Sequence, residues 1–167
     1  MRTKILGVFA ALLLVAACET APETGAAAGG TGASTGSGVA TTTQPAGPRA
    51  GSQEDLVVNV GDRVFFDFDK YNVRADQRGQ VEKWAAWLKR NPSVRVTVEG
   101  HADERGTREY NLGLGERRAN SVKDALVALG IDAGRLTTVS YGKERPAVLG
   151  SNDAAWAQNR RGVLVVN

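Results

Sequence analysis

The sequence predicts an α/β fold, an α+β sandwich in which helices pack on one face of a mixed four-stranded sheet. Four short segments with strand character alternate with segments of helical periodicity, in the order βαβαβ(α)β. This order is typical of helices layered on a sheet. The segments occupy residues 54–167, roughly 115 residues, which is the size of one domain with one core. A low-complexity stretch separates them from an apolar start of the chain.

The first 17 residues have the pattern of a lipoprotein signal peptide. Arg2 and Lys4 precede an apolar or small run at residues 5–17, which is shorter than the roughly 20 apolar residues that span a bilayer. Small residues lead into Cys18, the only cysteine of the chain. A disulfide within the chain is therefore excluded, and lipidation of Cys18 is expected. An ordinary secretory signal, cut near Ala17 with a free thiol beside it, is the alternative.

Residues 18–53 have the composition of a disordered tether. They are almost entirely Ala, Gly, Thr, Ser and Pro, with few charges and with Val39 as the one large apolar residue. Such a segment cannot bury enough surface to offset the entropy lost on ordering. About 35 residues of Gly-rich coil have an r.m.s. span of ~30–35 Å, so the tether would let the domain work at a distance from a membrane.

The charge balance gives little support to nucleic-acid binding. The whole chain has 21 Lys and Arg against 18 Asp and Glu. Loss of Arg2 and Lys4 with the signal leaves 19 against 18. Nucleic-acid binding needs a clustered basic face, and a nearly neutral mature protein does not favour one.

Within residues 54–167, strands are expected at residues 63–66, 94–99, 136–141 and 162–166. The second is the clearest, because valines alternate with polar residues and so bury one face. Residues 75–90 predict a helix with its apolar face at i, i+3, i+4 and i+7, formed by Val81, Trp84, Ala85 and Leu88. Asn91-Pro92 ends that helix, and Asp153 is expected to cap a short helix that reaches residue 159.

A polar turn at residues 101–107 joins the second strand to the longest predicted helix. The apolar stripe of that helix contains Leu112, Ala119, Val122, Leu126 and Leu129. The turn presents Asp103, and the helix carries arginines. Free backbone N–H groups at the helix start, acids in the turn and a cation on the helix can together hold a small ligand that bears both a carboxylate and an ammonium.

Four blocks of sequence carry a resemblance to a known family. They are VEGHADERGTREYNLGLGERRA at residues 98–119, FFDFDKYNVR at 65–74, TTVSYGKERP at 137–146 and AAWAQNRRGVLV at 154–165. Together they resemble the peptidoglycan-associated lipoproteins (Pal) of the OmpA-like domain family. The blocks are distributed from residue 65 to residue 165, and the architecture of the family agrees with the one expected from periodicity.

The resemblance implies a site for peptidoglycan of the diaminopimelate type. In the family, the residue at the position of Asp103 accepts from the ammonium of the stem peptide, and the residue at the position of Arg118 forks onto a carboxylate. Other positions that match the groove of the family are Asp69, Tyr71, Thr107, Asn111 and Leu114. From the residues alone, Arg118 could equally be a surface arginine paired with an acid. If Arg118 contacts the ligand, its truncation is expected to abolish cell-wall binding and to leave the melting curve unchanged.

The resemblance also implies a function. The chain is expected to be an outer-membrane lipoprotein whose periplasm-facing domain ties the membrane to the cell wall without a covalent bond, and it would need no cofactor. TolB and other Tol proteins would be its protein partners, with a role in constriction at cell division. A peptidoglycan hydrolase is the alternative from another class. An OmpA-like domain of a porin or flagellar stator is a further one, which the lack of a second long apolar run after Cys18 disfavours.

Catalysis and metal binding are not favoured by the residues themselves. His101 is the only histidine, and residues 54–167 contain no cysteine, so a zinc site would need an unusual set of carboxylates. His101 is expected to be a turn residue that hydrogen-bonds backbone. Asp103 with Glu104, or Asp67 with Asp69, could form a glycosidase pair, but adjacent acids in turns are usually solvated. The chain is therefore not expected to be an enzyme.

Overall fold

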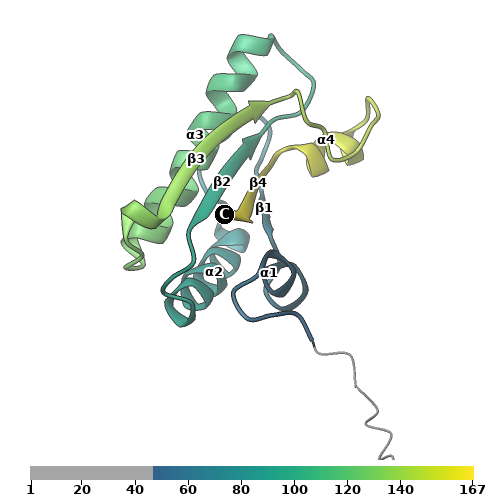
Figure 1. Cartoon of the computed structure of the whole chain (residues 1–167). Coiled ribbons are helices and arrows are strands. Elements are labelled where there is room, and N and C mark those ends of the chain that lie inside the picture. Colours follow the sequence, from purple (N-terminus) through teal and green to yellow (C-terminus); the bar gives the residue numbers. More distant parts are fainter. Residues whose placement is uncertain (1–46) are drawn as a thin grey trace, which may run out of the picture. The chain divides into compact units, whose positions relative to one another are not determined.

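The computed structural model of the chain describes residues 47–167 (Figure 1). The predicted signal peptide, the predicted lipidation site Cys18 and the predicted tether up to residue 46 lie outside the described residues. Gln53, at the expected end of the tether, begins a helix, and its side chain accepts from Val166 N at 2.7 Å. The folded domain therefore begins before residue 54.

A mixed sheet of four strands confirms the predicted fold class. Its strands lie in the order β1-β4-β2-β3 (Figure 1). They are β1 (Arg63–Phe65), β2 (Val96–His101), β3 (Leu136–Gly142) and β4 (Arg161–Val166). β2 and β3 are parallel, and β4 runs antiparallel to both of its neighbours, β1 and β2. Each expected strand is present, with ends displaced by up to two residues.

Four helices surround this sheet. They are α1 (Gln53–Asn59), α2 (Arg78–Arg90), α3 (Arg108–Ala128) and α4 (Asp153–Asn159), with short 3₁₀ turns η1 (Ala75–Gln77) and η2 (Ala133–Arg135). Only α1 was not expected, because its seven residues bury a single side chain, Leu56, and so carry no measurable periodicity. Within residues 47–167, none of these helices has the length and apolarity to cross a membrane.

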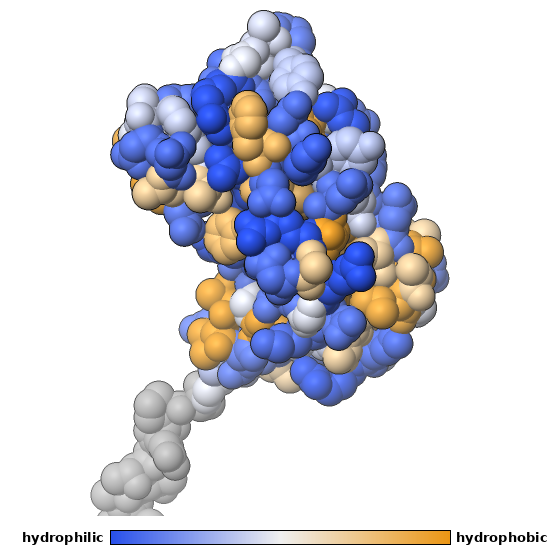
Figure 2. All heavy atoms as spheres, turned by 180° about the vertical axis from the view of Figure 1, so that it is seen from behind, coloured by the Kyte–Doolittle hydropathy of each residue, from blue (hydrophilic) through white to orange (hydrophobic). Residues whose placement is uncertain are grey.

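The hydrophobic core lies between α1, α2, α3 and one face of the sheet. Alternate residues of the strands enter it, as the period of a strand requires. Its buried members are Leu56, Val64, Phe66, Val81, Trp84, Ala85, Trp87, Leu88, Val96, Val98, Ala119, Val122, Leu126, Ile131, Leu136 and Leu164. The surface opposite to the view of Figure 1 is largely hydrophilic, with apolar groups in separate patches (Figure 2).

Two glycines bring α3 unusually close to β2. A Cβ atom on Gly100 would overlap the carbonyl oxygen of Gly115 in α3. The two backbones therefore touch, and the first half of α3 lies directly beside the loop that follows β2. The strand expected at residues 94–99 does not stop before Gly100, because β2 continues to His101.

The buried face of α3 differs from the predicted stripe in its first three turns. Leu112 is exposed, whereas Asn111, Leu114, Gly115 and Arg118 are buried. A polar residue and an arginine occupy inward positions that periodicity assigns to apolar side chains. They lie beside the loops after β1 and β2, where the candidate site is found.

Candidate functional site

A cavity of about 220 Å³ opens between the start of α3 and the loops that follow β1 and β2. It is lined by Phe68, Asp69, Asp103, Arg105, Gly106, Tyr110, Asn111, Leu114 and Arg118. Five of the seven residues predicted for the peptidoglycan site thus surround one cavity: Asp69, Asp103, Asn111, Leu114 and Arg118.

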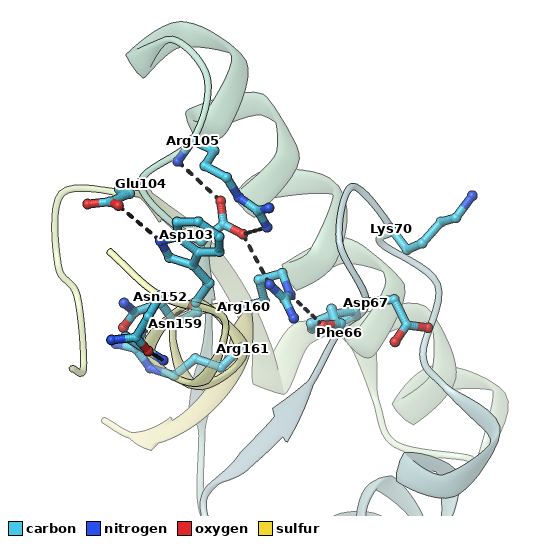
Figure 3. Close-up of polar contacts among 12 residues, drawn as sticks. Phe66, Asp67, Lys70, Asp103, Glu104, Arg105, Asn152, Asn159, Arg160 and Arg161 are labelled. Carbon is cyan, nitrogen blue, oxygen red and sulfur yellow. Dashed lines mark hydrogen bonds and ion pairs between the residues drawn. The ribbon is translucent and has the colours of Figure 1, made fainter. Parts of the chain in front are cut away.

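Asp103 supplies a buried carboxylate to this cavity. Only 4% of the residue is exposed, and its Oδ2 accepts from Arg105 Nη2 at 2.6 Å and from Arg160 Nη1 at 3.2 Å (Figure 3). Its Oδ1 accepts from the backbone N–H of Arg105 at 3.2 Å. Burial alone would raise the pKa of Asp103, but the hydrogen bonds from Arg105 and Arg160 outweigh it and hold the pKa below its usual value. The carboxylate is therefore ionised at neutral pH.

Arg118 is a fully buried arginine, with 0% of the residue exposed. Its Nε donates to Lys70 O at 2.8 Å, its Nη1 to His101 O at 2.8 Å and its Nη2 to Asp67 O at 3.1 Å. Burial lowers its pKa to about 10, so the guanidinium stays charged at neutral pH.

This environment changes the interpretation of Arg118. The residue is not the surface arginine paired with an acid that the sequence left open, since its acceptors are backbone carbonyls. Three of its five N–H groups hold the loop after β1 and the end of β2 against α3. Truncation would therefore affect stability as well as binding, contrary to the expectation of an unchanged melting curve.

Asp69 and Tyr110 form the rim of the cavity. The hydroxyl of Tyr110 donates a hydrogen bond to Asp69 Oδ1, across 41 positions of sequence. This bond raises the pKa of the tyrosine, so the hydroxyl keeps its proton. Asp69 has a left-handed backbone, with φ of 56°, which aspartate tolerates better than most residues. The pair joins the loop after β1 to the first turn of α3.

Asn111 and Leu114 form the inner wall. Asn111, 1% exposed, donates from Nδ2 to the carbonyl oxygen of Arg105 at 2.8 Å, and Leu114 is 4% exposed. The loop is also held from the β3 side, because Lys143 Nζ donates to the carbonyl oxygens of Glu104 and Gly106 at 3.1 and 2.7 Å. The backbone that carries Asp103 is therefore fixed from two directions.

Thr107 and Tyr71 do not line the cavity. Thr107 caps α3, where its Oγ1 accepts from Tyr110 N at 3.2 Å. Tyr71 is exposed and borders a separate, more apolar groove between α2 and α3. Both remain predictions as ligand contacts, and Thr107 has a structural role at the helix start.

His101 lies at the end of β2, not in a turn, and is 1% exposed. Its Nε2 is 3.3 Å from Glu99 Oε2, and its ring stacks on Tyr141 with centroids 5.5 Å apart. Burial, aided by Arg161 and Arg145, lowers its pKa to about 3, so the ring is neutral at physiological pH. Its Nε2 faces the Glu99 carboxylate, and a hydrogen bond with the backbone of Arg145 partly opposes the fall in its pKa.

Sequence reasoning missed Arg105, Tyr110 and Phe68 as cavity residues. The guanidinium carbon of Arg105 lies 3.9 Å from the ring centre of Phe68 and 4.1 Å from that of Trp156. Phe68 and Tyr110 carried a usable signal, because each lies close to a predicted site residue in the sequence. The inward position of Arg105 depends on α4, which supplies Trp156, and no local pattern indicates it. Among residues 47–167, no cluster of three or more potential metal ligands occurs.

Comparison with known proteins adds the following similarities. The chain matches the OmpA family over residues 65–160. A peptidoglycan-associated lipoprotein of Brucella melitensis is 53% identical over 117 residues, which cover 70% of each chain. One from Haemophilus influenzae is 52% identical over 101 residues, which cover 60% of this chain and 66% of the relative.

Solved structures show the same fold. The crystal structure of the peptidoglycan-associated lipoprotein from Burkholderia pseudomallei has a TM-score of 0.62 and 44% sequence identity, and the match covers 64% of this chain and 90% of that one. The periplasmic domain of Helicobacter pylori MotB matches with a TM-score of 0.55 at 20% identity, covering 62% of this chain and 69% of that one. The second likeness concerns the fold alone.

Proposed function

The chain belongs to the OmpA family, and on that premise we propose that it binds peptidoglycan non-covalently through the cavity beside α3. One observation carries this proposal: a buried carboxylate, Asp103, and a buried guanidinium, Arg118, line the same cavity. Opposite charges on two walls of one small cavity suit a zwitterionic group. The name of the relatives, peptidoglycan-associated lipoprotein, supports the same ligand.

Within peptidoglycan, the proposed target is the diaminopimelate residue of the stem peptide. The far end of its side chain bears an ammonium and a carboxylate on one carbon. Asp103 would accept from the ammonium, and Arg118, which keeps two N–H groups beyond its three backbone bonds, would donate to the carboxylate. Asp69 and Tyr110 border the entrance to the same cavity.

A hydrolase is the less favoured alternative, because Asp103 and Glu104 do not have the pKa values that a glycosidase pair needs. A glycosidase requires one carboxyl group with a raised pKa that can donate a proton. Hydrogen bonds hold the pKa of Asp103 below its usual value, as described above. Those from Ser151 and Trp156 lower the pKa of Glu104. Both groups are ionised at neutral pH, which suits binding of a cation.

The remaining parts of the proposal concern location and partners. Lipidation at Cys18 would anchor the chain to the outer membrane, with the domain of residues 47–167 facing the periplasm. The domain would tie that membrane to the cell wall, and TolB and other Tol proteins would be its protein partners during constriction at cell division. The lipoprotein signal pattern at residues 1–17 and the name of the Brucella relative support the lipid anchor, and the Tol partners follow from the family resemblance of the four sequence blocks.

Sedimentation with isolated cell walls tests the binding proposal. The full chain, purified in detergent, is mixed with walls that contain diaminopimelate and with walls that contain lysine at the same stem position. We expect co-sedimentation with the first kind, weaker binding to the second, and release by free diaminopimelate. Soluble muropeptides released from the walls would instead support the hydrolase, and equal binding to both kinds of wall would refute the proposed target.

A further inference from the structure

Arg105 occupies the part of the cavity where a ligand cation would meet Asp103. Its Nη2 lies 2.6 Å from Asp103 Oδ2, in an ion pair whose carboxylate side chain is only 5% exposed. The guanidinium also lies against the rings of Phe68 and Trp156, at 3.9 and 4.1 Å. A cation, an acid and two aromatic faces thus make a partly exposed cation site that the chain fills with its own side chain.

Both charged groups of the proposed ligand site are covered in this arrangement. Asp103 is 4% exposed and Arg118 is 0% exposed, so a ligand reaches either only after a covering side chain moves. The carboxylate of Asp103 is already neutralised by Arg105 and by Arg160. An incoming ammonium must therefore displace one of these two guanidinium groups.

Arg105 is the one that can leave. Arg160 is held at a second point, since its Nε donates to Phe66 O at 3.1 Å (Figure 3), and its side chain is 15% exposed. The side chain of Arg105 is 33% exposed, and its Nε is buried with no hydrogen-bond partner in the described part of the chain. An unpaired buried N–H destabilises the closed position, whereas the exposed side offers a path to water.

We propose that Arg105 is an internal competitor that determines the specificity of the site: a ligand binds by exchange of its ammonium for the Arg105 guanidinium on Asp103. The inference rests on the proposed function and concerns the same site. A ligand with an ammonium restores the charge balance of Asp103 when Arg105 leaves. A neutral or acylated ligand would leave the buried carboxylate with one fewer cation, and the site would reject it.

Binding of a muramyl tripeptide that ends in diaminopimelate, measured by calorimetry on the full chain in detergent, tests this exchange. Arg105→Gln keeps a long polar side chain and removes the competing charge. We expect it to bind the peptide about five- to tenfold more tightly than the wild type, because the ligand no longer displaces a partly exposed ion pair and a cation–π contact. Binding of the same peptide with its side-chain amine acetylated should remain weak in both proteins.

Arg108→Gln is the matched control for net charge. Arg108 lies three residues further along, its side chain is 66% exposed, and it pairs with Glu144 outside the cavity. We expect its affinity to equal that of the wild type. An equal gain in affinity for Arg108→Gln would show that the effect comes from the change in net charge, and it would overturn the proposed exchange.

Trp156 gives a second readout. Because the Arg105 guanidinium lies against its ring, departure of Arg105 should change the fluorescence of Trp156 when the peptide binds. The change should be absent in Trp156→Phe, which retains Trp84 and Trp87, and absent in Arg105→Gln. Weaker or unchanged binding by a folded Arg105→Gln variant would overturn the competitor role and make Arg105 a ligand contact or a bystander. No binding by the wild type would refute the proposed function itself.

Discussion

Replacement of Arg118 by methionine should destabilise the whole domain, because it removes the donors that hold two loops against α3. Methionine keeps most of the side-chain length and fills the buried space. The carbonyl oxygens of Asp67, Lys70 and His101 lose their partner. Asp67 and Lys70 are exposed residues whose carbonyls water can reach, whereas His101 is buried.

The size of the effect follows from these three bonds. A hydrogen bond from a charged donor contributes about 1.5–3 kcal/mol, and a buried acceptor left without a partner costs about 1–3 kcal/mol. With two of the three carbonyls rehydrated, and with the desolvation of Arg118 relieved, the net loss is about 3–5 kcal/mol. For a domain of roughly 115 residues, each kcal/mol lowers Tm by about 4 °C, so the expected shift is about 12–20 °C.

Thermal unfolding followed by circular dichroism measures this shift. Arg117→Met is the matched control, because Arg117 is the preceding residue of α3, is exposed, and lies over the rings of Tyr71 and Tyr110 at 5.7 and 5.9 Å. It should cost less than about 1 kcal/mol. If Arg118→Met melts within about 2 °C of the wild type, Arg118 does not hold the loops, and the description of the site fails.

Three further predictions concern other parts of the chain. Gly100→Ala should lower the free energy of unfolding by more than about 3 kcal/mol or prevent folding, because its Cβ would overlap Gly115 O. Gly79→Ala is the control and should stabilise α2 by about 0.5–1 kcal/mol, since no atom lies within 4 Å of its Cβ. Equal melting temperatures of the two variants would contradict the close contact between β2 and α3. The pKa of His101 is about 3 in the folded chain against an ordinary value of 6.5. The stability contributed by its neutral ring is therefore complete above pH 6.5 and is lost as the pH falls toward 3. Urea unfolding should thus show that the free energy of unfolding falls by up to about 2 kcal/mol between pH 6.5 and 5. The same pH dependence in a His101→Gln variant would show that His101 is not its cause. Cys18→Ser should abolish labelling with radioactive palmitate and release the chain from the outer-membrane fraction, and an unmodified Cys18 in mass spectra of the wild type would rule out the anchor.

The sheet and two of the main helices could be predicted because their signals are local. The alternation of valines in β2 and the apolar face of α2 at Val81, Trp84, Ala85 and Leu88 depend on residues within two turns or one strand. Helix α1 could not be predicted in this way. Its stability comes from distant partners, since Asp55 accepts from Trp87 Nε1 at 2.8 Å and Leu56 enters the core.

The sequence indicated which residues form the site better than it indicated their burial and their hydrogen-bond partners. Asp103 and Arg118 line one cavity, as the family resemblance implied. The burial of Arg118 could not be seen, because it depends on a loop 48 to 51 positions earlier in the chain that folds over α3. The ion pair of Arg105 with Asp103 could not be predicted either, because the position of Arg105 depends on Trp156 in α4. In both cases long-range packing decides what a charged side chain binds.

Binding of diaminopimelate-type cell walls by Asp103→Asn tests the central claim most directly. The matched control is Asp124→Asn, the same change at an exposed position of α3 outside the cavity. Loss of a charged partner from a partly buried pair costs about 2 kcal/mol or more, so we expect Asp103→Asn to bind the walls about thirtyfold more weakly while Asp124→Asn binds as the wild type does. Wild-type affinity in a folded Asp103→Asn variant would contradict the assignment of this cavity as the peptidoglycan site.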